Sequence, residues 1–130
     1  MDFIKFEPKH ILGIKEIDDQ HREIYKTVSH LFEIQKKEKK EILKTYGLLL
    51  TQLKDHFETE ENLMKKNDVV EFISHKLEHD RTLQKYTTYY NEFQFSKSPL
   101  NIEMLKSLKN WLEIHFEKKD IKLQLLARRN

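Results

Sequence analysis

Seven histidine and carboxylate side chains in this sequence lie at spacings that suit a metal site. They are His21, His56, Glu60, His75, His79, His115 and Asp120. His56 and Glu60 are four residues apart, as are His75 and His79, and residues four apart share one face of an α-helix. Imidazole and carboxylate groups bind iron, zinc, manganese, cobalt and nickel. The spacing therefore predicts one histidine-rich metal site with more ligands than a single ion needs.

One spacing within this set does not fit a regular helix. His115 and Asp120 are five residues apart, which turns their side chains about 140° away from each other on an ideal α-helix. A π-type bulge, or a helix that ends between them, would bring both side chains to one site. We therefore predict an irregular backbone over residues 117–120.

The composition favours a single all-α domain over residues 1–130. A chain of 130 residues can bury one core, and its two glycines, two prolines and 35% charged residues favour long helices over short strands. The absence of cysteine excludes disulfides, thiolate metal clusters and a cysteine nucleophile. His10 and His30 have no partner at ligand spacing, so we expect them to be structural or exposed.

Apolar residues recur at three- and four-residue steps over four segments, which predicts four helices. The first two are expected over about residues 17–35 and 41–65. The third follows an acidic capping box made by Asp68 and Glu71 and ends near Phe93. The fourth is expected to begin at Pro99, with Ser98 as its N-cap. An N-terminal arm and a short apolar C-terminal helix over about residues 121–126 complete the prediction.

The apolar stripe of the second predicted helix carries two of the metal-type side chains. Its members are Ile42, Tyr46, Leu49, Leu53, His56, Glu60 and Leu63. Gly47 interrupts this helix at a cost of about 1 kcal/mol relative to alanine, and it fits either a close helix crossing or a tolerated weak position. The stripe therefore places His56 and Glu60 where a helix of a soluble protein otherwise carries leucine.

Four helices joined by short connections favour an up-down-up-down antiparallel bundle. That topology brings the start of the first and third helices and the end of the second and fourth to the same end. All seven side chains would then meet in one layer. Burying so many polar groups without a cation would cost about 1–3 kcal/mol for each unpaired group, which a marginally stable domain tolerates poorly. Two ions sharing two carboxylates would use all seven groups, although the residue types alone do not select iron.

The charge pattern limits the classes of partner. The net charge is +2, from 24 basic and 22 acidic residues, which argues against a dedicated nucleic-acid surface. Charged residues interrupt the N-terminal segment MDFIKFEPKH, and no apolar run approaches the roughly 20 residues of a membrane span. We therefore expect a cytoplasmic protein that does not bind nucleic acid or membranes.

Four segments resemble the hemerythrin family, most of all its single-domain bacterial members. They are GIKEIDDQH (residues 13–21), HFETEE (56–61), HKLEH (75–79) and WLEIHFEKKD (111–120). The resemblance spans almost the whole chain and fills all seven ligand positions of the family in order. Phe6 stands where many members carry tryptophan, a difference that affects the N-terminal arm and removes no ligand.

The resemblance implies a non-haem centre of two iron ions (Fe2+/Fe3+) with a solvent-derived oxo or hydroxo bridge and O₂ as ligand. It assigns one iron to His75, His79 and His115, the other to His21 and His56, and the bridging positions to Glu60 and Asp120. Leu112 and Trp111 match residues of the family's oxygen pocket. The implied function is reversible dioxygen binding for storage, delivery or buffering.

Three alternatives remain open at this stage. The same di-iron site could belong to an enzyme that consumes O₂, peroxide or nitric oxide, and weak oxidase or peroxidase activity is compatible with a binding protein. A redox or oxygen sensor with a protein partner is the second alternative. A purely structural zinc bundle is the third, which metal analysis would test.

Overall fold

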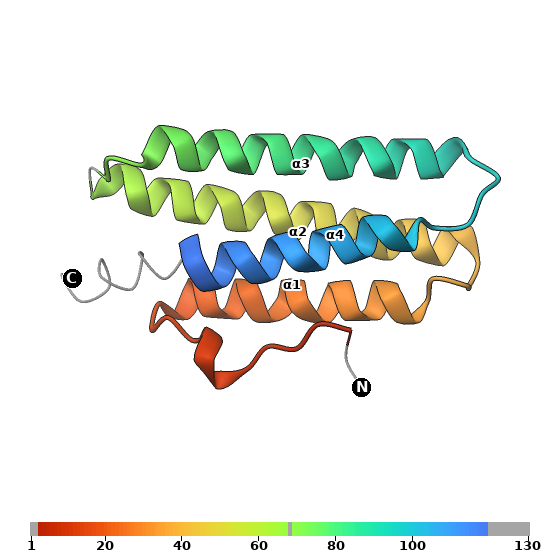
Figure 1. The fold of residues 1–130 in the computed structure, drawn as a ribbon, viewed down its shortest axis with the longest axis horizontal. Coiled ribbons are helices and arrows are strands. Elements are labelled where there is room, and N and C mark those ends of the chain that lie inside the picture. Colours follow the sequence, from red (N-terminus) through yellow and green to blue (C-terminus); the bar gives the residue numbers. More distant parts are fainter. Residues whose placement is uncertain (1–2, 68, 120–130) are drawn as a thin grey trace.

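Four long helices form an antiparallel bundle in this computed structural model, which describes residues 3–67 and 69–119. The helices are α1 (Lys15–Glu33), α2 (Lys39–Lys66), α3 (Phe72–Phe95) and α4 (Ile102–Ile114). A 3-10 helix, η1 (Pro8–His10), precedes them, and a π-helix, η2 (His115–Lys119), continues α4. The chain runs up, down, up and down, so the start of α1 lies beside the end of α2 (Figure 1). The predicted fold class and topology are confirmed, whereas the predicted C-terminal helix over residues 121–126 lies outside the described residues.

The predicted start of the fourth helix is wrong by three residues. Asn101 is the N-cap of α4, and its side chain accepts a hydrogen bond from the backbone N–H of Met104 (3.2 Å). The backbone N–H of Ser98 instead donates a hydrogen bond to the hydroxyl oxygen of Ser96 (2.8 Å). The asparagine cap satisfies the first turn of the helix, so Pro99 stays in the preceding connection.

The third helix also begins later than the capping box predicted. Glu71 occupies the N-cap position of α3 but makes no capping hydrogen bond with its side chain. The backbone N–H groups of Val69 and Phe72 donate to Met64 and Val69, so this segment forms a hydrogen-bonded turn and not a helix. Asp68 lies outside the described residues.

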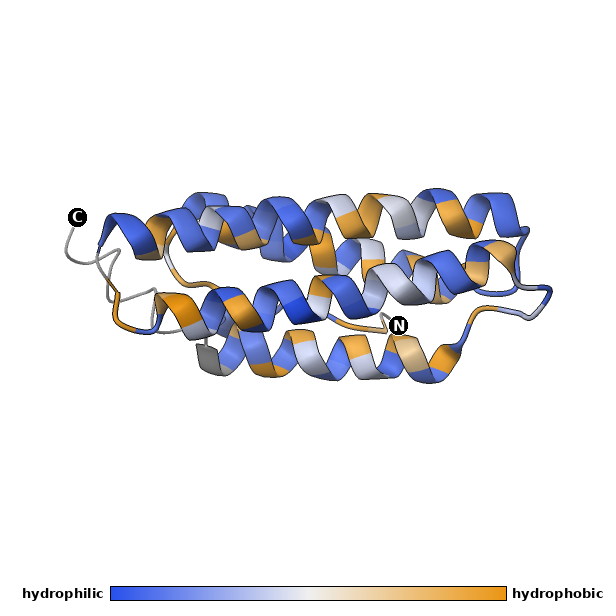
Figure 2. Ribbon diagram, turned by 90° about the horizontal axis from the view of Figure 1, so that it is seen from above, coloured by the Kyte–Doolittle hydropathy of each residue, from blue (hydrophilic) through white to orange (hydrophobic). Residues whose placement is uncertain are grey.

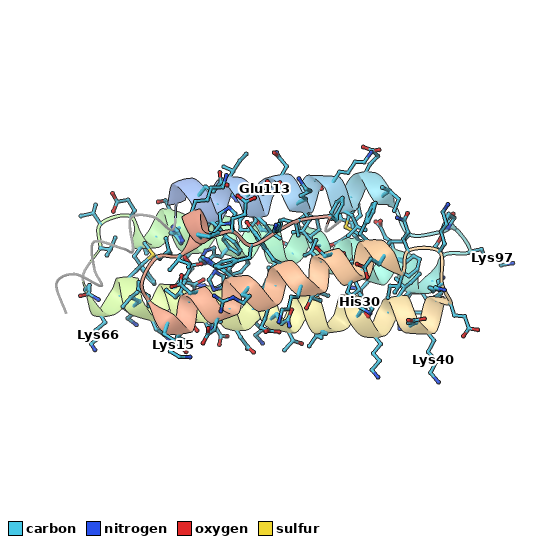
Figure 3. All side chains as sticks on the ribbon, turned by 90° about the horizontal axis from the view of Figure 1, so that it is seen from below. Lys15, His30, Lys40, Lys66, Lys97 and Glu113 are labelled. Carbon is cyan, nitrogen blue, oxygen red and sulfur yellow. The ribbon has the colours of Figure 1, made fainter. Side chains whose placement is uncertain are left out.

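The buried side chains follow the predicted apolar stripes. Figure 2 shows apolar residues recurring between hydrophilic ones along each helix, and Figure 3 shows Lys15, Lys40 and Lys66 pointing away from the bundle. On α2 the stripe drifts, so that Met64 is buried where Leu63 was predicted and Leu63 is only partly buried. A strict seven-residue repeat falls behind a straight α-helix by about 20° per heptad, which brings the next residue inward after three repeats.

Gly47 does not mark a close helix crossing. A Cβ atom at this position would meet only the hydroxyl oxygen of Tyr90, at 3.8 Å, which is ordinary van der Waals contact. The glycine is therefore the tolerated weak position in α2. None of the helices in the described ranges is long and apolar enough to cross a membrane.

The turn into α1 is held by a buried aspartate. The Asp18 carboxylate accepts hydrogen bonds from the backbone N–H groups of Leu12 (2.8 Å) and Gly13 (3.0 Å). Gly13 has a φ of 89°, a left-handed conformation that favours glycine. This closed turn fixes where α1 begins, and with it the position of His21 one turn further along.

Hydrogen bonds hold the N-terminal arm against α1 and against η2. Backbone atoms of Ile4 exchange two hydrogen bonds with the hydroxyl of Ser29, at 3.2 and 2.8 Å. The backbone N–H of Glu7 donates to Nδ1 of His10 (2.8 Å), so Nε2 of His10 carries the proton that meets Oε1 of Glu117 (3.0 Å). This hydrogen bond is the main reason that the pKa of Glu117 is lowered. His10 is thus a buried structural histidine, as predicted, and it ties the arm to the π-helix.

Candidate metal centre

Six of the seven predicted ligands converge at one end of the bundle, and the seventh, Asp120, lies outside the described residues. His21 comes from α1, His56 and Glu60 from α2, His75 and His79 from α3, and His115 from the first residue of η2. All six are buried, and four of them, His21, His56, Glu60 and His79, have no exposed surface. Four helices therefore supply this one polar cluster.

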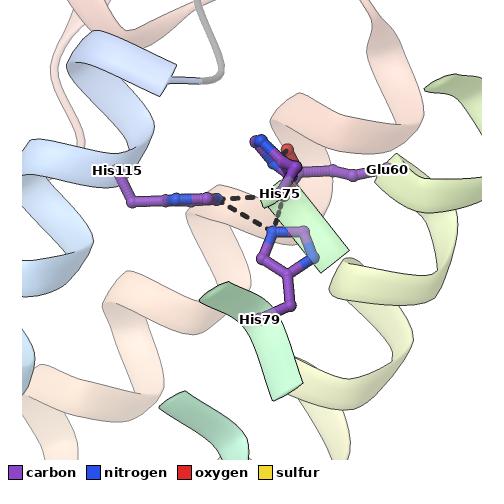
Figure 4. A group of neighbouring side chains, drawn as sticks. All are labelled: Glu60, His75, His79 and His115. Carbon is purple, nitrogen blue, oxygen red and sulfur yellow. Dashed lines mark hydrogen bonds and ion pairs between the residues drawn. The ribbon is translucent and has the colours of Figure 1, made fainter. Parts of the chain in front are cut away.

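Three histidines and the glutamate form the first half of the cluster. Nε2 of His79 lies 3.1 Å from Nε2 of His115. Oε1 of Glu60 lies 3.7 Å from Nε2 of His79 and 3.5 Å from Nε2 of His115, and Oε2 lies 3.6 Å from Nε2 of His75. Figure 4 shows His79, His115 and Glu60 grouped with His75. This half offers four donor atoms within 4.8 Å of one another.

Two histidines and the same glutamate form the second half. Nε2 of His21 lies 3.0 Å from Nε2 of His56, and Nε2 of His56 lies 2.7 Å from Oε1 of Glu60. These three donor atoms also lie within 4.8 Å of one another. Glu60 therefore belongs to both halves and joins them.

The geometry of this donor set suits a bound cation. Two metal–nitrogen bonds of about 2.1 Å that meet at a right angle place their donor atoms about 3.0 Å apart. The distances between the facing imidazole nitrogens, 3.0 and 3.1 Å, match this value. A cation would also hold the Glu60 carboxylate ionised in a place from which water is excluded. The residues present therefore form a buried histidine and glutamate group suited to metal.

The π-helix confirms the predicted irregularity over residues 117–119. A π-helix forms hydrogen bonds between residues five apart, so such residues lie one above the other along the helix. His115 opens η2 and faces the cluster with 1% of its surface exposed. A π-helix is one of the two irregularities that the five-residue spacing after His115 predicted.

Two polar residues outside the predicted ligand set contact the Nδ1 atoms of His79 and His56, the ring nitrogens that face away from the cluster. Nδ1–H of His79 donates to Oε2 of Glu61 (2.8 Å), and Nδ1–H of His56 donates to Oε1 of Gln20 (2.9 Å). Burial raises the pKa of Glu61, and the Lys76 ammonium opposes this shift. Gln20 and Glu61 lie next in sequence to His21 and Glu60, off the apolar stripes. Helical periodicity therefore gives no sign of their role.

Three of the imidazole rings stack on aromatic side chains. The ring of His21 lies 3.6 Å from that of Phe116, His79 lies 4.0 Å from Phe57, and His115 lies 4.4 Å from Trp111. The interplanar angles are 15°, 8° and 11°. Such flat stacking limits ring rotation and keeps each Nε2 turned toward the cluster. Trp111 therefore lies beside His115, and Leu112 is fully buried in the adjoining core, while their place in an oxygen pocket stays a prediction.

Two known proteins are similar to this chain in sequence. A bacteriohemerythrin of Methylococcus capsulatus is 29% identical over 104 residues, which cover 79% of each chain. A bacteriohemerythrin of Aquifex aeolicus is 29% identical over 109 residues, covering 80% of this chain and 82% of the relative.

Solved structures show the same architecture. A crystal structure of wild-type hemerythrin superposes with a TM-score of 0.86 at 24% identity, covering 94% of this chain and 95% of the other. A leucine-to-tyrosine variant of hemerythrin superposes with a TM-score of 0.88 and covers 95% and 96%. Residues 12–126 match the family model described as the hemerythrin HHE cation binding domain. The chain therefore belongs to the hemerythrin family.

Proposed function

We propose that this protein binds dioxygen reversibly at a non-haem di-iron centre. His75, His79 and His115 would hold one iron and His21 and His56 the other, with Glu60 and Asp120 bridging the pair. The family to which the chain belongs and the buried histidine and glutamate group support this assignment. The proposal is of a binding protein and not of an enzyme.

The observation that carries the proposal is the shared position of Glu60. Its carboxylate belongs both to the group with three histidines and to the group with two. A single ion would need only one of these groups. Two groups of unequal size, joined by one carboxylate, suit two ions of which one has fewer protein ligands and so keeps a position for an exogenous molecule.

The residues around the cluster would protect this chemistry. When bound, the iron pair would supply the two electrons that reversible dioxygen binding requires. Leu112, Phe57 and Phe116 are buried, and their apolar side chains exclude water from the neighbourhood of the donor atoms. The stacked Trp111 keeps the His115 ring in place. Exclusion of water and protons slows irreversible oxidation of the reduced state.

Anaerobic iron reconstitution followed by titration with O₂ tests the proposal. We expect two irons per chain, and a visible absorption band that forms with O₂ and disappears under argon over repeated cycles. His75→Ala should abolish the band, whereas His30→Ala, which changes an exposed histidine, should leave it unchanged. Failure to form a reversible band would contradict dioxygen binding, and sustained O₂ consumption with a reductant would favour an enzyme.

A further inference from the structure

The two halves of the metal centre differ in the chemistry that supports their histidines. His79, in the half with three histidines, donates through Nδ1–H to the carboxylate of Glu61 at 2.8 Å. His56, in the half with two histidines, donates through Nδ1–H to the amide oxygen of Gln20 at 2.9 Å. Both imidazoles are fully buried. Two equivalent hydrogen bonds thus end on a charged acceptor in one half and on a neutral acceptor in the other.

The carboxylate of Glu61 is fixed by its surroundings. Only 14% of its side chain is exposed, and Oε1 lies 3.8 Å from Nζ of Lys76. Lys76 in turn lies 3.0 Å from Asp80. Burial raises the pKa of Glu61, and the Lys76 ammonium opposes this effect and favours the ionised form, while its ion pair with Oε1 leaves Oε2 turned toward His79.

The amide of Gln20 is fixed equally well. Its Nε2 donates to the hydroxyl of Thr59 (2.9 Å), and that hydroxyl donates to the backbone carbonyl of Asp55 (2.9 Å). Because the Thr59 hydroxyl hydrogen is donated to this carbonyl, its oxygen acts as the acceptor in the hydrogen bond with Gln20. The amide nitrogen therefore faces Thr59, and the amide oxygen faces His56.

Glu78 adds to the negative charge beside the half with three histidines. Oε1 of Glu78 lies 3.9 Å from Nδ1 of His115, which adds a second carboxylate beside the half with three histidines. Glu61 and Glu78 thus place two carboxylates beside the half with three histidines.

A carboxylate that accepts the outer N–H of a metal-bound histidine makes that histidine a stronger donor, and loss of such a partner costs about 10–100-fold in metal affinity. We propose that Glu61 and Gln20 are positioning residues that make the two metal positions unequal. Glu61 strengthens the position with three histidines, and Gln20 leaves the position with two histidines weaker and more easily vacated. This inference rests on the proposed two-metal function, and it adds a charge effect to the difference in ligand number.

Exchange of the two partners tests the inference, because Glu and Gln have nearly the same shape. The metal-stripped full chain is titrated with Co²⁺ under argon, with calorimetry and visible absorption as readouts. We expect two binding steps in the wild type. Glu61→Gln should weaken the tighter step about 10–100-fold and leave the weaker step in place. Gln20→Glu should tighten the weaker step about 10-fold. The double variant should reduce or reverse the difference in affinity between the two binding steps.

Controls separate this inference from the proposed function. Glu58→Gln removes an exposed carboxylate from the same helix as Glu61 and should change neither step. Two steps that Glu61→Gln and Gln20→Glu leave unchanged would overturn the inference but not the two-metal site. A wild type that binds one Co²⁺ ion or none would overturn the proposed function itself. Far-ultraviolet circular dichroism checks that each variant is folded. If one variant unfolds, the inference is tested by whether the other variant changes the affinity of its own binding step.

Discussion

The apolar stripes of the helices carry different kinds of residue at the two ends of the bundle: the site end, which holds the candidate metal ligands, and the far end opposite it. At the far end, α2 and α3 meet through Tyr46 and Tyr86, where the hydroxyl of Tyr46 donates to the backbone carbonyl of Tyr86 (2.5 Å). The hydroxyl of Tyr86 pairs in turn with Ser107 (2.8 Å). At the site end, the same stripes carry His56 and His79, whose Nε2 atoms face other imidazoles and a carboxylate.

The comparison shows where the fold obtains its stability. The far end pairs the hydroxyls of Tyr46 and Tyr86 within the protein and packs them among buried leucines, so these groups need no added ligand. The site end gathers nitrogen and oxygen donors that a cation would join. We therefore expect the far end to stabilise the helices on its own and the site end to depend on metal.

The largest expected effect comes from removing the metal. Binding to the folded state alone adds about 4 kcal/mol to the free energy of unfolding when the free metal concentration is 1,000 times its dissociation constant. Glu60→Gln removes the charge shared by both halves, so the variant should lose most of this gain. Thermal unfolding with Co²⁺ and with a chelator measures the difference. An equal metal-dependent gain in Glu60→Gln and in the wild type would show that Glu60 does not join the two halves.

The next effect tests whether the far end stabilises the fold independently of metal. Leu49 is fully buried, whereas its neighbour Leu48 is 52% exposed. Leu49→Ala should lower the free energy of unfolding by about 2–5 kcal/mol through lost burial and the cavity left behind. Leu48→Ala is the matched control and should change it by less than about 0.5 kcal/mol. Both should keep the wild-type metal stoichiometry, and a loss of metal in Leu49→Ala would show that the two ends are coupled.

A smaller effect concerns the Tyr46 hydroxyl and depends on pH. Burial is the main cause that raises the pKa of Tyr46 above its ordinary value of 10.0, and the nearby Tyr86 and Tyr89 add to the shift. The unfolded chain loses this proton above about pH 10 while the folded chain keeps it, so the free energy of unfolding should fall as the pH rises through that range.

Tyr46→Phe should make that fall less steep. It should also cost about 1 kcal/mol at neutral pH through the lost hydrogen bond. Denaturant titrations at pH 7 and between about pH 9.5 and 11 measure both effects. If the free energy of unfolding fell equally steeply with pH in the variant and in the wild type, the assigned role of Tyr46 would be contradicted.

The smallest effect is a gain in stability. Gly47 lies inside α2, and a Cβ atom there would make only ordinary contact with the Tyr90 hydroxyl. Gly47→Ala should raise the free energy of unfolding by up to about 1 kcal/mol, because alanine loses less conformational freedom in a helix. Denaturant unfolding measures the change. A loss of stability would indicate that α2 and α3 approach more closely at this point than the 3.8 Å contact implies.

Periodic features of the sequence were enough to predict the bundle and the candidate ligands. Apolar residues at helical steps predicted four helices, and the same steps placed His56, Glu60, His75 and His79 on inward faces. The five-residue spacing after His115 predicted an irregular backbone, which the π-helix η2 confirms over the described residues. These features are local, because they depend only on the rotation per residue within one helix.

The tertiary structure alone decided the contacts that join distant segments. Gln20 meets His56, Glu61 meets His79, and His10 meets Glu117 across 107 residues. It also placed the N-cap of α4 at Asn101 rather than Ser98, and it put only an ordinary van der Waals contact with Tyr90 beside Gly47. Such contacts depend on how helices pack and where their turns close. Single polar residues off the apolar stripes carry no periodic pattern that would reveal their partners in the sequence.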